Sequence, residues 1–125
     1  FNVLISNTDD HLRNHGFLYN DSAGWRLSPA YDINPVPLDM KPRVLSTAID
    51  IDDATASLEL ALQVAGYFEV TASDARQIVC EVATAVRSWR SVAANLGLSA
   101  KQIERMSSAF EHAELKKAKT LGKKR

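Results

Sequence analysis

All four prolines of this chain lie between positions 29 and 42, and they limit where helices can form. Proline has no backbone N–H, and its ring pushes the preceding residue toward extended conformations, so we expect no helix across this segment. Apolar residues recur at helical spacing from position 53 onward, whereas the first 52 residues combine short apolar runs with turn formers. The sequence therefore predicts an irregular first part and a helical second part.

The helical part, residues 53–115, is expected to form a small bundle of three helices. The first helix is indicated by four apolar residues at i, i+3, i+4 and i+7 on one face. Thr71 provides an N-cap for the longest helix, which we expect to continue to a stop at Gly97. Ser99 and Gln102 form a capping box for the last helix. The 125 residues together are expected to form one mainly α domain.

A small β-hairpin is predicted ahead of the helical part. Residues 15–19 and 25–27 flank the sequence Asn-Asp-Ser-Ala-Gly, whose members favour tight turns. Residues 44–51 alternate weakly between apolar and polar side chains, and we expect a short edge strand there.

A dense group of polar side chains, residues 6–14, follows the apolar run of residues 3–5. Burying charged groups costs several kcal/mol unless they are paired or bind a metal, so this density predicts a functional site. Within it, Asp9 and Asn14 are five positions apart, and Asp32 follows in a mostly apolar setting. Phosphoryl transfer from ATP requires a carboxylate near the attacking hydroxyl, then a carboxamide and a carboxylate that hold Mg²⁺. The three residues occur in the order that protein kinases use.

The neighbouring residues match a known family. The sequence of residues 7–18, followed by that of residues 25–33, closely resembles the C-terminal part of the HipA-like serine/threonine kinases, toxins of bacterial toxin–antitoxin pairs. That family's pattern reads roughly N-x-D-D/G-H-x-K/R-N, then a short hairpin, then L-x-P-x-Y/F-D-I. The chain departs from the pattern at Ser6, where glycine is frequent, and at Arg13, where lysine is frequent.

The resemblance implies a role for each position. Asp9 corresponds to the catalytic carboxylate, and Asn14 and Asp32 correspond to the Mg²⁺ ligands that also bind ATP through the metal. Asp9 and Asp10 are also favoured N-caps for a helix that starts near Leu12, so a purely structural interpretation of the acidic pair stays open. The residues expected to support the loop are Asp10, His11 and Arg13.

The resemblance also implies what the intact protein does. Its cofactors would be Mg²⁺ and ATP, and it would arrest growth in the cytoplasm by phosphorylating a translation component, an aminoacyl-tRNA synthetase in the best-known members. A helix-turn-helix antitoxin that binds operator DNA would hold it inactive. A kinase also needs a phosphate-covering loop and an ATP-binding lysine, yet the five glycines here are scattered and no lysine precedes Lys41. We therefore expect a C-terminal fragment without the ATP-covering lobe, inactive alone.

Composition leaves two other classes of function open. Residues 1–70 carry a net charge of −6 and residues 71–125 a net charge of +6, with a basic tail at 116–125 that we expect to be disordered. The basic half suits either a solvated helix face or a non-catalytic module that contacts an antitoxin or DNA. A metal-dependent phosphohydrolase is the other alternative. A single cysteine and the absence of any long apolar run argue against disulfide-bonded, secreted and membrane-spanning classes.

Overall fold

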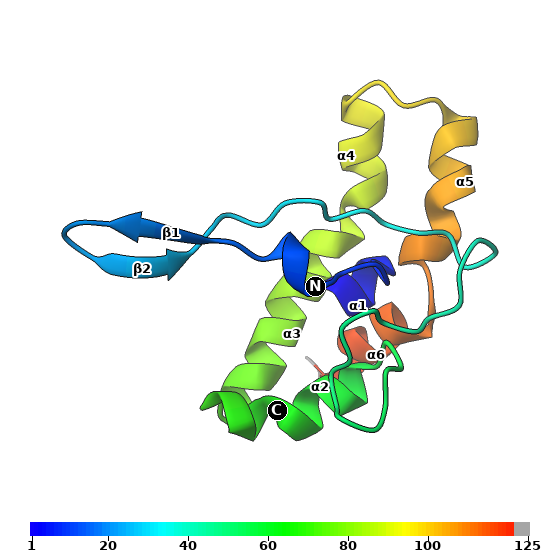
Figure 1. The fold of residues 1–125 in the computed structure, drawn as a ribbon. Helices are drawn as coiled ribbons and strands as arrows, with labels where there is room; N and C mark the ends of the chain where they lie inside the picture. The colour runs from blue at the N-terminus through cyan, green and yellow to red at the C-terminus, as the bar shows by residue number, and fades with distance from the viewer. Residues whose placement is uncertain (122–125) are drawn as a thin grey trace.

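The computed structural model describes residues 1–121 and contains helices with one small hairpin (Figure 1). This architecture confirms the mainly α prediction. Among these residues, no helix is both long enough and apolar enough to cross a bilayer. The elements, with η for 3₁₀ helices, are α1 Asn2–Ile5, η1 Leu12–Asn14, β1 Phe17–Asn20, β2 Gly24–Leu27, α2 Leu58–Val64, η2 Ala65–Phe68, α3 Ala72–Arg87, α4 Trp89–Asn95, α5 Ala100–Phe110 and α6 Ala113–Leu121.

The short helix α1 lies at the centre of the fold and supplies much of its core (Figure 1). Leu4 and Ile5 keep only 1% and 3% of their surface exposed. Helices α3, α5 and α6 all contact α1, so segments from the far end of the sequence enclose it. Burial of a leucine-sized side chain contributes about 1.5–3 kcal/mol, which fixes the backbone from which the polar residues 6–14 depart. The other buried residues of this core are Val3, Leu45, Ala56, Leu58, Ala83, Val86, Leu115 and Ala118.

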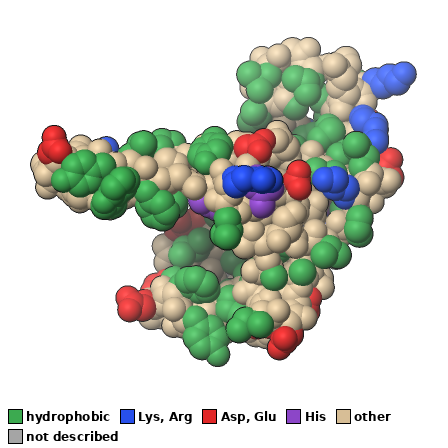
Figure 2. All heavy atoms as spheres, in the orientation of Figure 1, with side chains coloured by type: hydrophobic (Ala, Val, Ile, Leu, Met, Phe, Trp, Pro, Cys, Tyr) green, Lys and Arg blue, Asp and Glu red, His purple; other side chains and the backbone are tan. Residues whose placement is uncertain are grey.

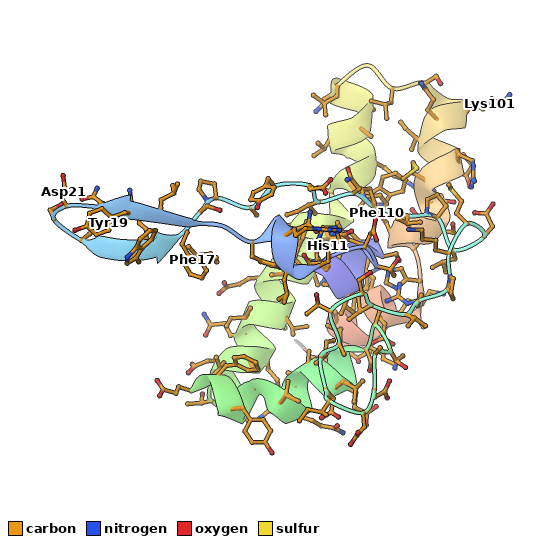
Figure 3. All side chains as sticks on the ribbon, in the orientation of Figure 1. His11, Phe17, Tyr19, Asp21, Lys101 and Phe110 are labelled. Atoms are coloured by element: carbon orange, nitrogen blue, oxygen red, sulfur yellow. The ribbon has the colours of Figure 1, made fainter. Side chains whose placement is uncertain are left out.

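The predicted hairpin forms and projects away from the helices (Figure 1). Its strands pair antiparallel, with Phe17 opposite Leu27 and Tyr19 opposite Trp25, so these four side chains share one face. Gly24 closes the turn with φ of +70°, a conformation that other residues rarely adopt. The four side chains are between 60% and 71% exposed, and Figures 2 and 3 show apolar groups along the projecting arm. The hairpin thus carries an apolar face that the rest of the described chain does not cover.

The proline-rich segment has no helix, as predicted, but the edge strand expected at residues 44–51 is wrong. Only one isolated bridge forms there, between Val44 and Thr55. The carboxylates of Asp50 and Asp53 accept hydrogen bonds from backbone N–H groups two residues further on. Such local bonds compete with strand pairing, and the chain forms turns instead.

The long helix predicted from residue 71 to Gly97 is interrupted at Ser88, which separates α3 from α4. The Ser88 hydroxyl donates to the Ala85 carbonyl at 2.8 Å, a local bond of the kind that competes with a continued helix. The prediction of a disordered tail at residues 116–125 is also partly wrong, because residues 116–121 belong to α6. Ala118, fully buried in the core, holds this helix in place. The rest of that tail, residues 122–125, lies outside the described residues.

Candidate functional site

The polar loop begins at Ser6, directly after α1, where the backbone turns into the left-handed conformation with φ of +56°. Glycine adopts this conformation without steric cost, which accounts for its frequency at this position in the resembling pattern. Here the serine hydroxyl supplies compensating bonds. It donates to the Ala109 carbonyl at 2.9 Å and accepts from the Arg43 guanidinium at 2.6 Å.

The residues just before Asp9 are clamped by a segment that follows much later in the sequence. Ser46 donates twice to the Thr8 carbonyl, from its backbone N–H at 3.0 Å and from its hydroxyl at 3.1 Å. Arg43 also donates to the Val3 carbonyl at 2.8 Å and to the Ala56 carbonyl at 3.1 Å. The backbone that leads to Asp9 is therefore fixed by bonds at both ends of α1 and at Thr8.

Asn14 and Asp32 lie in direct contact. The Asn14 amide donates to Asp32 Oδ2 at 2.6 Å, across 18 positions of sequence. Asn34 donates to the other oxygen, Oδ1, at 2.7 Å. Asn14 is buried, and its Oδ1 accepts the His11 backbone N–H at 3.1 Å, so its side chain is held on two sides. Asp32 has φ of +55°, a conformation that aspartate tolerates better than most residues.

The three residues expected to support the loop, Asp10, His11 and Arg13, make different kinds of contact. Asp10 accepts from the Asn2 amide at 2.7 Å and lies 3.0 Å from His15 Nε2, which ties the loop back to α1. His11, labelled in Figure 3, is the N-cap residue of η1. Its buried Nδ1 has no hydrogen-bond partner among the described residues. Arg13 contributes its carbonyl, which accepts from the Tyr31 hydroxyl at 2.9 Å. The Arg13 guanidinium forms no ion pair within residues 1–121.

Asp9 stands apart from the other two proposed site residues. Its side chain is 64% exposed, and its ion pair is with Lys41, whose Nζ lies 3.8 Å from Asp9 Oδ2. Within residues 1–121, no hydrogen bond joins the Asp9 side chain to Asn14 or Asp32. The structure thus brings together the two expected metal ligands and leaves the expected catalytic carboxylate open to solvent.

A pocket of about 240 Å³ lies beside this group, between η1 and the base of the hairpin. Its lining includes Asp10 and Asn14 together with Ser28 and Tyr31. Within residues 1–121, no three His, Cys, Asp or Glu side chains form a cluster that could hold a metal ion.

The donor set suits Mg²⁺ rather than a softer metal. Asn14 and Asp32 offer a carboxamide and a carboxylate, the hard oxygen ligands that Mg²⁺ accepts alongside waters and substrate phosphates. Asp32 forms no ion pair within the described chain, and both of its oxygens accept only neutral amide donors. Its negative charge is therefore available to a cation.

Three residues of the site were not predicted. Asn34 lies two positions after Asp32, a local spacing that the sequence offers as a signal. Arg43 and Ser46 contact residues 37 and 38 positions away, and no local pattern indicates contacts at that separation.

The family model for the HipA-like C-terminal domain matches residues 1–90. The chain belongs to this family. The match covers α1 to α3, and with them every proposed site residue. HipA proteins are in general kinases, and the family has a toxin–antitoxin context. No curated protein and no solved structure matches the chain.

Proposed function

We propose that this HipA-like domain supplies the metal-binding and substrate-facing half of an ATP- and Mg²⁺-dependent serine/threonine protein kinase. The contact between Asn14 and Asp32 supports the proposal most directly, because it brings together two side chains, 18 positions apart in the sequence, whose oxygens are of the kind that the chemistry requires. Both residues lie within the part of the chain that the family model matches.

Each proposed site residue has a task that its surroundings suit. Asp9, exposed beside the fixed backbone of Thr8, would accept or orient the hydroxyl proton of a protein substrate. Asn14 and Asp32 would hold Mg²⁺, which when bound neutralises charge on the ATP phosphates. Asp10 would keep the loop against α1 through Asn2.

The remainder of the kinase would lie outside these 125 residues, because the sequence contains no glycine cluster that could cover the phosphates. On the family resemblance we propose a cytoplasmic toxin whose substrate is a translation component such as an aminoacyl-tRNA synthetase. A helix-turn-helix antitoxin that binds DNA would be its partner.

The proposal is tested by phosphate transfer from labelled ATP, with the full-length protein and a cell lysate as acceptor. Asp9→Asn and Asp32→Asn should each reduce labelling by about 100-fold or more, the effect typical of removing a group that acts on the transition state. Asp21→Asn is the matched control, since Asp21 lies at the exposed tip of the hairpin and should leave transfer unchanged (Figure 3).

Transfer that survives both site substitutions would overturn the proposal. Cleavage of a phosphoester without ATP would instead favour the phosphohydrolase. A loss of antitoxin or DNA binding only on charge reversal at Arg87, Arg90 or Lys101 would favour the non-catalytic module.

A further inference from the structure

A second pocket, of about 280 Å³, lies where the C-terminal end of α3 meets α6. It shares no lining residue with the pocket beside Asn14. Residues that contribute to its wall are Arg87, Trp89, Glu111, His112, Lys116 and Lys119. Three of these six side chains are cationic, and they converge from two helices.

Within residues 1–121, the three cations of this pocket, Arg87, Lys116 and Lys119, form no ion pair with a carboxylate. Glu111 is the acid that lines the pocket, and Arg90 holds it through Nε and, at 3.0 Å, through Nη2. These bonds, with a smaller contribution from the Lys119 charge, keep the pKa of the Glu111 carboxyl below its usual range, so its charge is present at neutral pH and is balanced mainly by Arg90.

Lys117, next to Lys116 on α6, is by contrast paired, with its Nζ 2.7 Å from Glu114 Oε1. Lys116 and Lys119 are three positions apart and therefore share a face of α6. Like charges that converge on a concave surface repel one another, and an anion bound between them removes that repulsion.

The groups around the pocket favour recognition of a phosphate group over an aromatic base. Trp89 already stacks on Phe110, with 4.4 Å between the ring centroids, and the Arg90 guanidinium lies over the Trp89 ring at 4.8 Å from its centroid. The arginine fork matches two phosphate oxygens at once, and two lysines add charge without fixed geometry. A dianionic phosphate monoester therefore fits three cations better than a singly charged carboxylate does.

We propose that the pocket formed by Arg87, Lys116 and Lys119 binds a phosphate monoester. The ligand is either a small phosphorylated metabolite or a phosphorylated side chain of a protein. This site does not depend on the kinase assignment, because its residues lie outside the proposed catalytic group.

The experiment titrates the purified protein with inorganic phosphate, free phosphoserine, a phosphoserine heptapeptide and its glutamate counterpart, using calorimetry. Saturable binding of the phosphorylated probes is expected, and the Lys116→Gln/Lys119→Gln double variant should weaken it by about tenfold or more, because it removes two of the three cationic donors. Arg87→Gln should weaken it similarly. Lys101→Gln is the control, because this exposed lysine lies at the start of α5 and does not line the pocket (Figure 3).

Tighter binding of the peptide than of free phosphoserine would identify a protein source, and equal affinity would identify a metabolite. Three results would overturn the proposal: no saturable binding of any phosphorylated probe, equal weakening by Lys101→Gln, or equal affinity for the glutamate peptide. A duplex DNA that binds more tightly than every monoester, with affinity that falls steeply with salt, would also overturn it and assign the surface to nucleic acid. Because the three cations are exposed, the variants should keep the thermal unfolding midpoint of the parent.

Discussion

Replacement of Arg43 by methionine should remove a large part of the stability of this domain. The guanidinium is half-buried and makes three bonds, to Ser6 Oγ at 2.6 Å and to the carbonyls of Val3 at 2.8 Å and Ala56 at 3.1 Å. Burial lowers the pKa of Arg43, and the nearby Glu114 carboxylate opposes that shift. Methionine keeps most of the apolar stem but leaves two carbonyls without this donor.

The expected loss is about 3–5 kcal/mol, because breaking a partly buried charged network by removing one partner leaves the others unsatisfied. A domain of this size has a free energy of unfolding of about 5–15 kcal/mol, so the effect should be large. Urea unfolding followed by circular dichroism should show a lower midpoint with an unchanged slope. Arg43→Lys keeps the positive charge but cannot make all three bonds, so its urea midpoint should lie between those of the parent and of Arg43→Met.

The matched control is Arg76→Met on α3, because Arg76 is exposed and forms no ion pair within residues 1–121. It should change the free energy of unfolding by less than about 0.5 kcal/mol. A loss below about 1 kcal/mol for Arg43→Met, or an equal loss for Arg76→Met, would refute the anchoring role, since either result means that the three bonds contribute little net stability.

Three further perturbations test other parts of the structure. In urea unfolding, Ser6→Ala should destabilise the domain by about 1–2 kcal/mol more than Ser6→Gly, because both variants lose the hydroxyl bonds but only glycine adopts the left-handed backbone without strain. The reverse order would contradict the claim that the backbone at Ser6 is strained. Leu115→Ala should cost about 2–5 kcal/mol if α6 is part of the core, whereas an unchanged urea midpoint would indicate a loose tail. Burial, together with the Arg43 charge, lowers the pKa of His112 below its usual 6.5, so the unfolded chain binds its proton first on acidification. The free energy of unfolding, measured between pH 7.5 and 5.5, should therefore decrease as the pH is lowered below about 6.5. His112→Gln should make this pH dependence weaker.

Local signals in the sequence predicted local structure well. The Asn-Asp-Ser-Ala-Gly turn forms the hairpin, and Thr71 and Ser99 cap α3 and α5 with the hydroxyl bonds that their spacing indicates. In each case the interacting groups lie within a few residues of one another, so the pattern contains the whole interaction. The contact between Asn14 and Asp32 was expected only because the kinase pattern joins two distant segments.

The features that the sequence missed depend on distant partners. The helix breaks at Ser88, within a pattern that is otherwise periodic, and the local bond of the Ser88 hydroxyl competes there with a continued helix. Residues 116–121 are rich in lysine, and only their packing against the core, through Ala118, explains why they are helical. The bonds of Arg43 to α1 join residues up to 40 positions apart, so no short stretch of the sequence indicates them.

The hairpin has an entropic effect on the candidate site. Strand pairing shortens the flexible part of the chain between Asn14 and Asp32. The bond from the Ser28 N–H to the Gly16 carbonyl, at 2.8 Å, extends this pairing. The loop to be closed falls from about 18 to about 6 residues, which lowers its closure cost by about 1 kcal/mol. Because such coupling is reciprocal, a ligand that holds Asn14 against Asp32 should stabilise the hairpin by the same amount. The amide protons between its strands should then exchange with solvent about fivefold more slowly, which would report occupancy of the site from a distance.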